Sequence, residues 1–396
     1  MIISLILSIL FFIGLYLPTI PTDGNWMQLE IIYLAIAIIV IVVLLFKQKK
    51  IDIKQITLGV IFNGLALYFT KISNPNSNPK EMLLYYFIFF IALTLVLQLD
   101  FTNVNSESVM KYLKIFLLCI SILSIIISIS IIAQIGPVTG RLITYYSSFY
   151  PELVPRMISL GKPVNTFGVH SLAGVFNFLF FLLNFATFYV LKAKEHFIIS
   201  LFFLFFLVRL QSTTSLVCLL IALMIIGIYI YTENKYIFFG LLALVITFLV
   251  LSWNELSIVQ ILKRNLFNED STNGLMVRFG PKGVLYGSLQ QIIQYPFKGT
   301  GYVSVPDTYY IDSGIIHFAL RTSVIGMLAF YGMLLNFFVK NLNWLMGIAL
   351  FTLFMFFEIG FSNFLYFRII YFLPFFIFYL KQLLLIKKNQ KELKLR

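Results

Sequence analysis

The sequence predicts an all-α, polytopic integral membrane protein with about 12 transmembrane helices and two long extracytoplasmic loops that contain short helices. Three observations predict this class. Of the 396 residues, 60% are hydrophobic and 11% are charged, whereas a soluble domain is about 45–50% apolar and about 25% charged. The mean hydropathy is +0.95. The 44 Phe and 22 Tyr exceed what one water-soluble core needs. The excess apolar side chains must face lipid, and residues 1–396 are expected to form a single transmembrane domain.

Twelve apolar runs account for the predicted transmembrane helices, because about 20 apolar residues cross the hydrocarbon core. They cover residues 2–17, 29–46, 55–72, 82–98, 113–133, 171–191, 197–210, 214–231, 236–252, 315–339, 344–360 and 364–382. The first run has no basic segment ahead of it and no small-residue cleavage site before Pro18 and Pro21. We therefore interpret it as an uncleaved helix rather than a removed signal peptide.

Clusters of lysine predict the orientation of the chain. Lysines are dense in the stretch 47–50, and Lys387 and Lys388 follow the last apolar run. Loops rich in Lys and Arg stay on the cytoplasmic side of a membrane. Both termini are therefore predicted to be cytoplasmic, and the segments 134–170 and 253–314 become long loops on the outer side.

The net charge of +13 at first suggests any anionic partner, including nucleic acid. On this topology most lysines lie on the inner side, where they set the orientation and meet anionic membrane lipid, so no nucleic-acid partner is expected. Seven of the eight arginines lie outside: Arg141, Arg156, Arg209, Arg264, Arg278, Arg321 and Arg368. The planar guanidinium matches phosphate oxygens in a bidentate way, so an outer anion site is expected. Alternatively, these arginines pair with outer carboxylates or lipid headgroups.

The two long outer loops combine aromatic and polar residues. Aromatic rings stack on the C–H faces of sugars, and amide, carboxylate and hydroxyl groups bind sugar hydroxyls. Tyr286, Gln290, Tyr302 and Tyr309 are the candidates for glycan binding. An interfacial aromatic belt is the alternative explanation for outer tyrosines.

Within the second loop the spacing predicts an amphipathic helix that begins at Pro281, a residue suited to the first helical position. Its polar stripe comprises Lys282, Tyr286, Gln290 and Gln294 at steps of four residues. The opposite side comprises Leu285, Leu289, Ile292 and Ile293. Arg278 would lie beside the helix start, where an anion is favoured. The helix either lies on the membrane, or caps a cavity, or only packs.

The residues that could perform chemistry are few. Cys119 and Cys218 lie inside apolar runs and the chain has only 3 His, so neither a metal site nor a cofactor is predicted. Asp312 lies at the outer mouth of a predicted span, with His317 slightly deeper. A carboxylate near a low-dielectric boundary is a plausible base with a raised pKa. As an alternative role, Asp312 could cap the following helix.

Several motifs resemble a known family. The order Arg278, Pro296, Gly299-x-Gly301, Asp312-Ser313 and Gly326 resembles the C-terminal half of Wzy-type O-antigen and capsular polysaccharide polymerases. The stretch Lys162-Pro163 to Thr166-Phe167-Gly168-x-His170-Ser171-Leu172-Ala173 resembles their loop-to-helix entry, and Ser212-Thr213-Thr214-Ser215 recurs there too. The resemblance covers roughly residues 160–330. O-antigen ligases and other membrane glycosyltransferases of the GT-C class share this layout.

The resemblance implies a polysaccharide polymerase in the bacterial cytoplasmic membrane. Its donor would be a growing glycan on undecaprenyl pyrophosphate, its acceptor a lipid-linked repeat unit, and a chain-length regulator protein a possible partner. For the base, Asp312 ranks first, His170 second and His317 third. For binding the pyrophosphate, Arg278 and Arg321 rank first, followed by Arg209, with Arg156 and Lys282 as further candidates.

Two other functions remain open from the sequence. An O-antigen ligase would transfer the whole glycan to a different acceptor. A lipid-linked oligosaccharide flippase or another transporter would also fit many helices with intramembrane charges, although no internal repeat is evident.

Overall fold

The computed structural model describes residues 2–16, 26–47, 52–73, 80–101, 107–146, 153–168, 170–210, 212–233, 285–303, 313–360, 362, 364 and 366–395. Within these ranges the protein is α-helical and contains no strand. Each predicted apolar run coincides with a helix except the run 236–252, which lies outside the described residues.

The helices are labelled in chain order. They are α1 (Ile2–Tyr16), α2 (Trp26–Phe46), α3 (Ile53–Ile72), α4 (Lys80–Leu97), α5 (Glu107–Ile132), α6 (Gly136–Tyr146), α7 (Leu153–Ser159), α8 (His170–Leu191), α9 (Lys194–Leu210), α10 (Thr213–Glu233), α14 (Tyr286–Gln294), α15 (Gly314–Asn341), α16 (Trp344–Gly360) and α17 (Phe367–Leu395). Five of them, α3, α5, α8, α15 and α17, contain a stretch long and apolar enough to cross a membrane. Five further apolar helices are shorter. The chain is therefore a helical, membrane-embedded protein.

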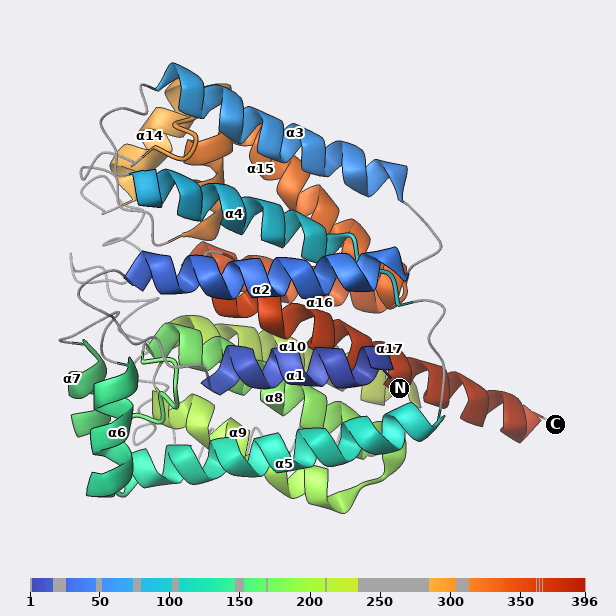
Figure 1. Cartoon of the computed structure of the whole chain (residues 1–396). Helices are drawn as coiled ribbons and strands as arrows, with labels where there is room; N and C mark the ends of the chain where they lie inside the picture. The colour runs from blue at the N-terminus through green and yellow to red at the C-terminus, as the bar shows by residue number, and fades with distance from the viewer. Residues whose placement is uncertain are drawn as a thin grey trace.

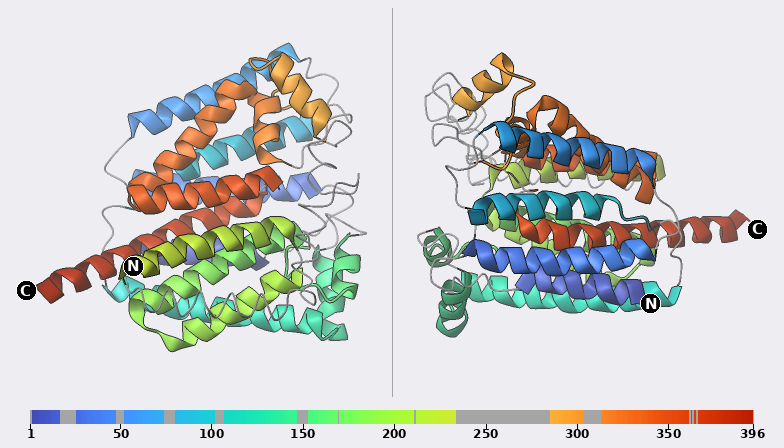
Figure 2. Two further views of the ribbon diagram at one scale, coloured as in Figure 1. Left: turned by 180° about the vertical axis from the view of Figure 1, so that it is seen from behind. Right: turned by 45° about the horizontal axis from the view of Figure 1, so that its top comes forward.

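The long helices run side by side, and the short helices gather at one end of the bundle (Figure 1). This end, which we call the α14 end, carries α6, α7 and α14. The opposite end, which we call the terminal end, carries both chain termini (Figures 1 and 2). The segments predicted to be outer and inner thus separate to opposite ends, and the two termini share one side.

Helix α17 lies in the middle of the bundle and extends past it towards the C-terminus (Figure 2). Its phenylalanines fill the core: Phe372, Phe375 and Phe376 are buried. Phe11 of α1 stacks on Phe375 with ring centroids 4.4 Å apart. Edge-to-face and offset-stacked rings contribute about 0.5–1.5 kcal/mol per pair beyond their buried area. Part of the high Phe content therefore serves helix packing rather than contact with lipid.

Close helix contacts depend on small residues at particular places. A Cβ on Gly174 of α8 would lie 1.9 Å from the Ser215 hydroxyl oxygen of α10. The Ser215 hydroxyl in turn donates to the Ser212 oxygen at 3.0 Å. The polar stretch 212–215 therefore packs directly against the start of α8, which carries the His170-Ser171-Leu172-Ala173 motif.

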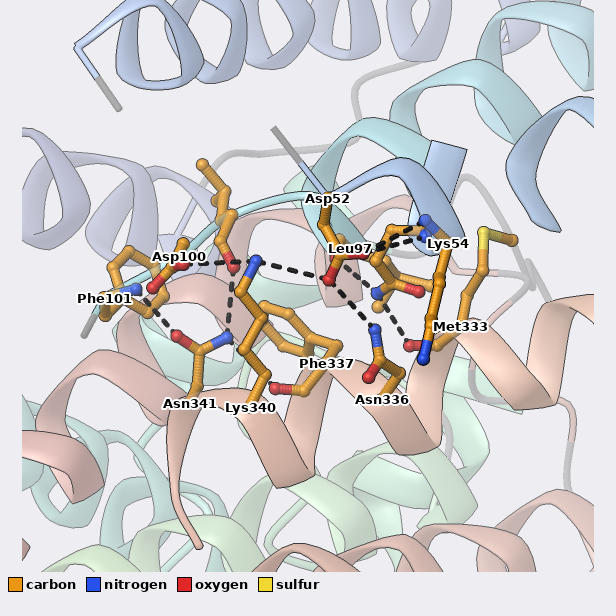
Figure 3. A network of polar contacts seen from close by, with 12 residues as sticks. Asp52, Lys54, Leu97, Asp100, Phe101, Met333, Asn336, Phe337, Lys340 and Asn341 are labelled. Atoms are coloured by element: carbon orange, nitrogen blue, oxygen red, sulfur yellow. Dashed lines mark hydrogen bonds and ion pairs between the residues drawn. The ribbon is translucent and has the colours of Figure 1, made fainter. Parts of the chain in front are cut away.

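A network of ion pairs lies at the terminal end (Figure 3). Lys340, in the last turn of α15, lies 3.1 Å from an Asp100 carboxylate oxygen and 3.5 Å from an Asp52 carboxylate oxygen. Asp52 also accepts hydrogen bonds from the Lys54 and Gln55 backbone N–H groups and so caps α3. The lysine is therefore held between the start of α3 and the end of α4.

Amide side chains extend this network (Figure 3). Asn341 donates to the Leu99 carbonyl at 3.0 Å and accepts from the Phe101 backbone N–H at 2.7 Å. Asn336 donates to Asp52 at 3.3 Å. The two Asn341 bonds satisfy backbone groups of Leu99 and Phe101, which follow the end of α4. Lys340, Asp52 and Asp100 at the terminal end are thus paired with one another.

The predicted amphipathic helix is present as α14, and residues 281–284, with which we expected it to begin, lie outside the described residues. Leu285, Leu289 and Ile292 pack against Ile316 and Leu320 of α15. The assignment of Ile293 to the packed side was wrong. Its side chain is 69% exposed, because α14 touches the bundle along a stripe too narrow to include it.

Candidate functional site at the α14 end

Helix α15 is broken at Ser323. This residue has φ 66° and ψ 173°, so the helical backbone stops before it and restarts after it. That region of backbone space is occupied essentially only by glycine, and holding another residue there costs about 1–3 kcal/mol. The Ser323 hydroxyl is also buried without a hydrogen-bond partner in the described structure. Strain of this kind is retained where the surrounding structure enforces it.

The segment 296–301 supplies the backbone hydrogen bonds that the break removes. Pro296 accepts from the Val324 N–H at 2.9 Å, and the N–H groups of Thr300 and Gly301 donate to the Leu320 and Arg321 carbonyls, each at 2.9 Å. Unsatisfied backbone groups at membrane depth cost several kcal/mol each, so non-helical backbone there has to be compensated by protein. The break and this segment therefore form one structural unit.

Gly301 is required at its position in this unit. Its φ is +67°, and a Cβ would lie 2.2 Å from the Thr70 hydroxyl oxygen of α3. The same hydroxyl accepts from the Tyr302 N–H at 2.8 Å. The Gly299-x-Gly301 motif thus serves close backbone contact between this segment, α3 and α15.

Arg321 lies inside this unit and is 1% exposed. Its Nη1 donates to the Gly301 and Val303 carbonyls at 2.9 and 3.1 Å. Its guanidinium lies 3.8 Å from the centre of the Tyr86 ring, a cation–π contact. No carboxylate of the described residues is within ion-pair distance. Arg321 is therefore a buried cation held by neutral acceptors.

His317 lies one turn before Arg321 and is also 1% exposed. The Arg321 Nε–H donates to His317 Nε2 at 2.6 Å. A guanidinium N–H is only a donor, so Nε2 has to be the unprotonated nitrogen and Nδ1 carries the hydrogen. Nδ1 has no partner within the described residues. This geometry favours a hydrogen-bond donor at His317 rather than the base that the sequence ranked third.

The predicted glycan-binding residues are distributed unevenly. Tyr286 and Gln290 lie on α14, where Tyr286 is exposed and Gln290 is partly exposed, so their polar stripe does face outwards. Tyr302 is 2% exposed and packs against the Phe87 and Phe90 rings. Its hydroxyl lacks a partner in the part of the chain that is described. The position of Tyr302 is that of a core residue.

A second group of cations lies on the other half of the α14 end. Arg156 of α7 and Arg209 at the end of α9 are exposed, and Lys162 lies in the turn after α7. Burial, followed by the positive charges of Arg156 and Arg209, lowers the pKa of Lys162. No carboxylate among the described residues forms an ion pair with these three side chains. We call Arg156, Lys162 and Arg209 the basic cluster.

Sequence reasoning missed Lys162 as a site residue, although it noted Lys162-Pro163 as part of a motif. The only signal in the sequence was the positive charge of Lys162, because Arg209, whose charge acts on it, is 47 residues later in the chain. It also missed Glu30, which is 3% exposed near the start of α2. Glu30 is the one acidic residue of the apolar run 29–46, and this isolated charge was the signal that could have marked it as a site residue.

Four Arg or Glu residues of the described part of the chain are buried near the α14 end, whereas the buried Asp100 side chain at the terminal end, 7% exposed, is paired with Lys340. The four residues are Glu30, Arg321, Glu358 and Arg368. Glu358 accepts from the Tyr331 hydroxyl and the Phe364 N–H, both at 3.1 Å. Arg368 donates to the Leu15 carbonyl at 3.1 Å and the Thr166 hydroxyl at 3.3 Å. Because intramembrane charges mark functional regions, this end is the candidate site.

The remaining predicted residues are placed as follows. His170 is the first residue of α8 and is partly exposed. Asp312, Arg278, Lys282 and Tyr309 lie outside the described residues. Arg321 and His317, for which the sequence predicted different roles, are in direct contact, and Arg156 and Arg209 each lie within electrostatic range of Lys162.

Among the described residues, no group of three or more His, Cys, Asp or Glu could hold a metal ion. No family model, curated protein or solved structure matches the chain.

Proposed function

We propose that this protein is a membrane glycosyltransferase that joins undecaprenyl-pyrophosphate-linked repeat units into an O-antigen or capsular polysaccharide. The observation that carries the proposal is the environment of the cations at the α14 end, which differs from that of Lys340. Lys340 at the terminal end is paired with Asp52 and Asp100. At the α14 end, Arg321 and the basic cluster have no carboxylate partner among the described residues. Cations without counter-ions suit an anionic substrate.

In this proposal the reaction takes place at the outer face of the bacterial cytoplasmic membrane. The chain crosses the membrane about 12 times, both termini are cytoplasmic, and the α14 end is outer. Lipid-linked donor and acceptor enter from the surrounding membrane, and a chain-length regulator protein is a further partner. The motifs that resemble Wzy-type polymerases support this assignment.

The proposed reaction is a displacement at the anomeric carbon of the donor. A base removes the proton of the acceptor hydroxyl, the oxygen forms the new glycosidic bond, and the bond to the lipid pyrophosphate breaks. Negative charge develops on the leaving pyrophosphate, and fixed cations stabilise it in a low-dielectric site. Arg156, Lys162 and Arg209 would bind this group, and Arg278 and Lys282 are further candidates.

The experiment is to incubate purified protein in lipid nanodiscs with a lipid-linked repeat unit. A ladder of oligomers is expected. The double variant Arg156→Ala/Arg209→Ala should lower the rate by about 100-fold or more, because two charge-assisted contacts are lost. Arg141→Ala is the matched control, since Arg141 is an exposed arginine of α6 outside the basic cluster. A ladder that is unchanged in the double variant would contradict the role of the cluster, and no covalent product with wild-type protein would contradict the function.

Transport of a lipid-linked oligosaccharide is the second candidate, and the break at Ser323 favours it. Broken helices form the substrate sites of many transporters. Movement of a fluorescent lipid-linked repeat unit across a vesicle membrane, without any covalent product, would support a flippase. A single transfer to a different acceptor, without a ladder, would support an O-antigen ligase.

The proposed mechanism assigns charge stabilisation to arginine and lysine and uses no cofactor. Chelators should therefore leave the ladder unchanged. Reversible loss of activity on chelation, with recovery on adding a divalent cation, would contradict this part of the proposal.

A further inference from the structure

Helix α14 runs across the long helices rather than alongside them (Figure 2). It packs on Ile316 and Leu320 of α15, before the break in that helix. The chain after α14 touches the last turn of α3, where the Tyr302 N–H donates to the Thr70 hydroxyl at 2.8 Å. Because α3 is long and apolar enough to cross a membrane, its end marks the boundary between hydrocarbon and lipid headgroups. Helix α14 therefore lies at the level of this boundary.

Exposed apolar and aromatic side chains gather at the end of α14. The side chains of Ile293 and Phe297 are 69% and 70% exposed, and that of Tyr295 is also exposed. Tyr286 lies seven residues before Ile293, about two turns away on the same face of the helix, and is exposed as well. We call Ile293, Tyr295, Phe297 and the exposed Lys298 the α14 surface. None of these four side chains is buried by the described part of the chain.

The last turn of α3 continues the α14 surface. Tyr68 and Ile72 are each 59% exposed, and Lys71 is exposed too. A Cβ on Gly299 would lie 2.7 Å from the ring of Phe69, which is the neighbour of Tyr68. The two exposed groups thus lie on either side of one contact. Only 28% of the apolar stretch of α3 is buried inside the protein, so the α14 surface is continuous with the lipid-facing side of a membrane span.

Two lysines give this region a positive charge. Lys298 Nζ lies 5.8 Å from the centre of the Tyr295 ring, a cation–π contact. Lys71 lies in the last turn of α3. Neither lysine forms an ion pair with a carboxylate of the described residues. Tyrosine is enriched at the level of the headgroups, and lysine is attracted there by anionic lipid. The charge and the aromatic rings therefore complement a lipid surface.

The α14 surface is joined directly to the segment that completes the break in α15. Pro296, the residue before Phe297, accepts from the Val324 N–H at 2.9 Å. The Thr300 N–H, three residues after Phe297, donates to the Leu320 carbonyl at 2.9 Å. A contact between Phe297 and the membrane would therefore hold this segment, and with it the broken part of α15, at one depth.

We propose that the α14 surface binds the membrane at the α14 end of the bundle. Ile293, Tyr295 and Phe297 enter the boundary between headgroups and acyl chains, while Lys298 and Lys71 bind anionic lipid headgroups. The partner is the lipid surface and not a second copy of the chain. Interfacial helices bury their apolar face by about 5–10 Å. This inference does not depend on the proposed enzymatic function.

The depth of single side chains tests the proposal in the full chain, reconstituted in lipid nanodiscs. Cys119→Ser removes the exposed cysteine, and Cys218 is buried. Nitroxide labels are attached to Ile293→Cys, Phe297→Cys and, as matched control, Gln294→Cys, which is on the exposed polar stripe. Collision with O₂ and with a water-soluble nickel complex gives the depth of each label. The first two labels should lie about 5–10 Å below the lipid phosphates, and the control at or above them. Equal access of nickel to all three would overturn the proposal.

Lipid composition tests the two lysines. With the label at Phe297→Cys, the variant Lys71→Gln/Lys298→Gln is compared in phosphatidylglycerol and phosphatidylcholine nanodiscs. Each lysine near an anionic surface favours contact by about fivefold, so the ratio of membrane-bound to water-exposed label should fall by about 25-fold in phosphatidylglycerol. Lys71→Arg/Lys298→Arg keeps both charges and should behave as wild type. A loss of equal size in the two lipids would overturn the assignment of the lysines to anionic headgroups.

A second copy of the chain is the competing occupant of the α14 surface. Double electron–electron resonance between Phe297→Cys labels in liposomes separates the two cases. We expect no fixed distance between labels at any ratio of protein to lipid. One fixed distance that persists as the protein is diluted with lipid would overturn the proposal and assign the surface to a dimer.

Discussion

The Nε of Arg321 lies 2.6 Å from Nε2 of His317, one turn away on the same helix, and this contact fixes which nitrogen of the imidazole is protonated. A charged donor faces one ring nitrogen, so the neutral ring has to carry its hydrogen on the other. The pair therefore presents two kinds of donor, a guanidinium and an imidazole N–H, within the broken part of α15.

The tautomer of His317 can be measured directly. We expect the neutral, Nδ1-protonated form at neutral pH, because protonation at Nε2 would place two donors against each other. The chain has only 3 His, so ¹⁵N-histidine labelling with a His317→Gln variant assigns the signal. A signal from the Nε2-protonated tautomer would contradict the hydrogen-bond assignment.

Replacing Arg321 should affect folding as well as product. Arg321→Ala leaves the Gly301 and Val303 carbonyls without a donor, and each unsatisfied buried group costs about 1–3 kcal/mol. We expect a lower folded yield by size-exclusion chromatography and loss of long-chain product. Arg321→Lys keeps the positive charge but loses the several N–H donors of the guanidinium. It should therefore restore the folded yield more fully than the synthesis of long-chain product. Normal yield and normal chain length in Arg321→Ala would contradict both roles.

The basic cluster should lower stability in the absence of an anion. Burial and the charges of Arg156 and Arg209 lower the pKa of Lys162 below that of an unfolded lysine. Between these two pKa values the unfolded chain binds more protons than the folded chain, so the stability of the fold rises with pH in that range. At neutral pH all three side chains are charged, and the repulsion between Lys162 and the two arginines is fully present. Lys162→Met should raise the unfolding temperature by about 1–2 °C and weaken binding of a pyrophosphate lipid.

Lys162→Arg is the matched control for this prediction. Wild-type affinity for the pyrophosphate lipid should fall as the pH rises through the lowered pKa of Lys162, whereas the arginine variant should retain its affinity. Equal pH dependence in the two proteins would show that Lys162 does not contact the anion.

Ser323→Gly should stabilise the protein. Glycine adopts the backbone conformation of Ser323 without steric cost and removes a buried hydroxyl that lacks a partner among the described residues. The expected gain is about 1–3 kcal/mol, seen as a higher unfolding temperature. Ser323→Ala removes only the hydroxyl and should give a smaller gain. A lower unfolding temperature for Ser323→Gly than for Ser323→Ala would contradict the strain assigned here.

The network of Lys340 should be sensitive to acid. Burial acts to raise the pKa of Asp52, but hydrogen bonds from Gln55 and Asn336 and the charge of Lys340 outweigh it and lower the pKa. Its stabilising effect is therefore present above the unfolded pKa of about 4 and is lost as the pH falls through the lower folded value. Asp52→Asn keeps a capping side chain and should cost about 0.2–1 kcal/mol near neutral pH. Thermal unfolding at several pH values should show this difference vanish in acid.

The sequence predicted the helices well because about 20 consecutive apolar residues leave few alternatives. It predicted α14 from the four-residue spacing of Tyr286, Gln290 and Gln294, although Ile293 showed that spacing alone does not give the width of a contact. The break at Ser323 was not predictable, since neither Pro nor Gly marks it and the apolar run continues through it. Lys162 and Glu30 were missed because their neighbours come from helices distant in the chain.

The carbonyl groups that accept hydrogen bonds from Arg321 come before it in the sequence, and this order has a consequence for membrane insertion. An arginine inside an inserting helix is costly, by about 2.5–3.5 kcal/mol at the helix centre and less towards its ends. The Gly301 and Val303 carbonyls lie 20 and 18 residues ahead of Arg321 in the chain, so they are synthesised first. Arg321 therefore meets acceptors that already exist when α15 leaves the ribosome. A chain in which the segment 296–303 followed α15 would have to insert this arginine unpaired.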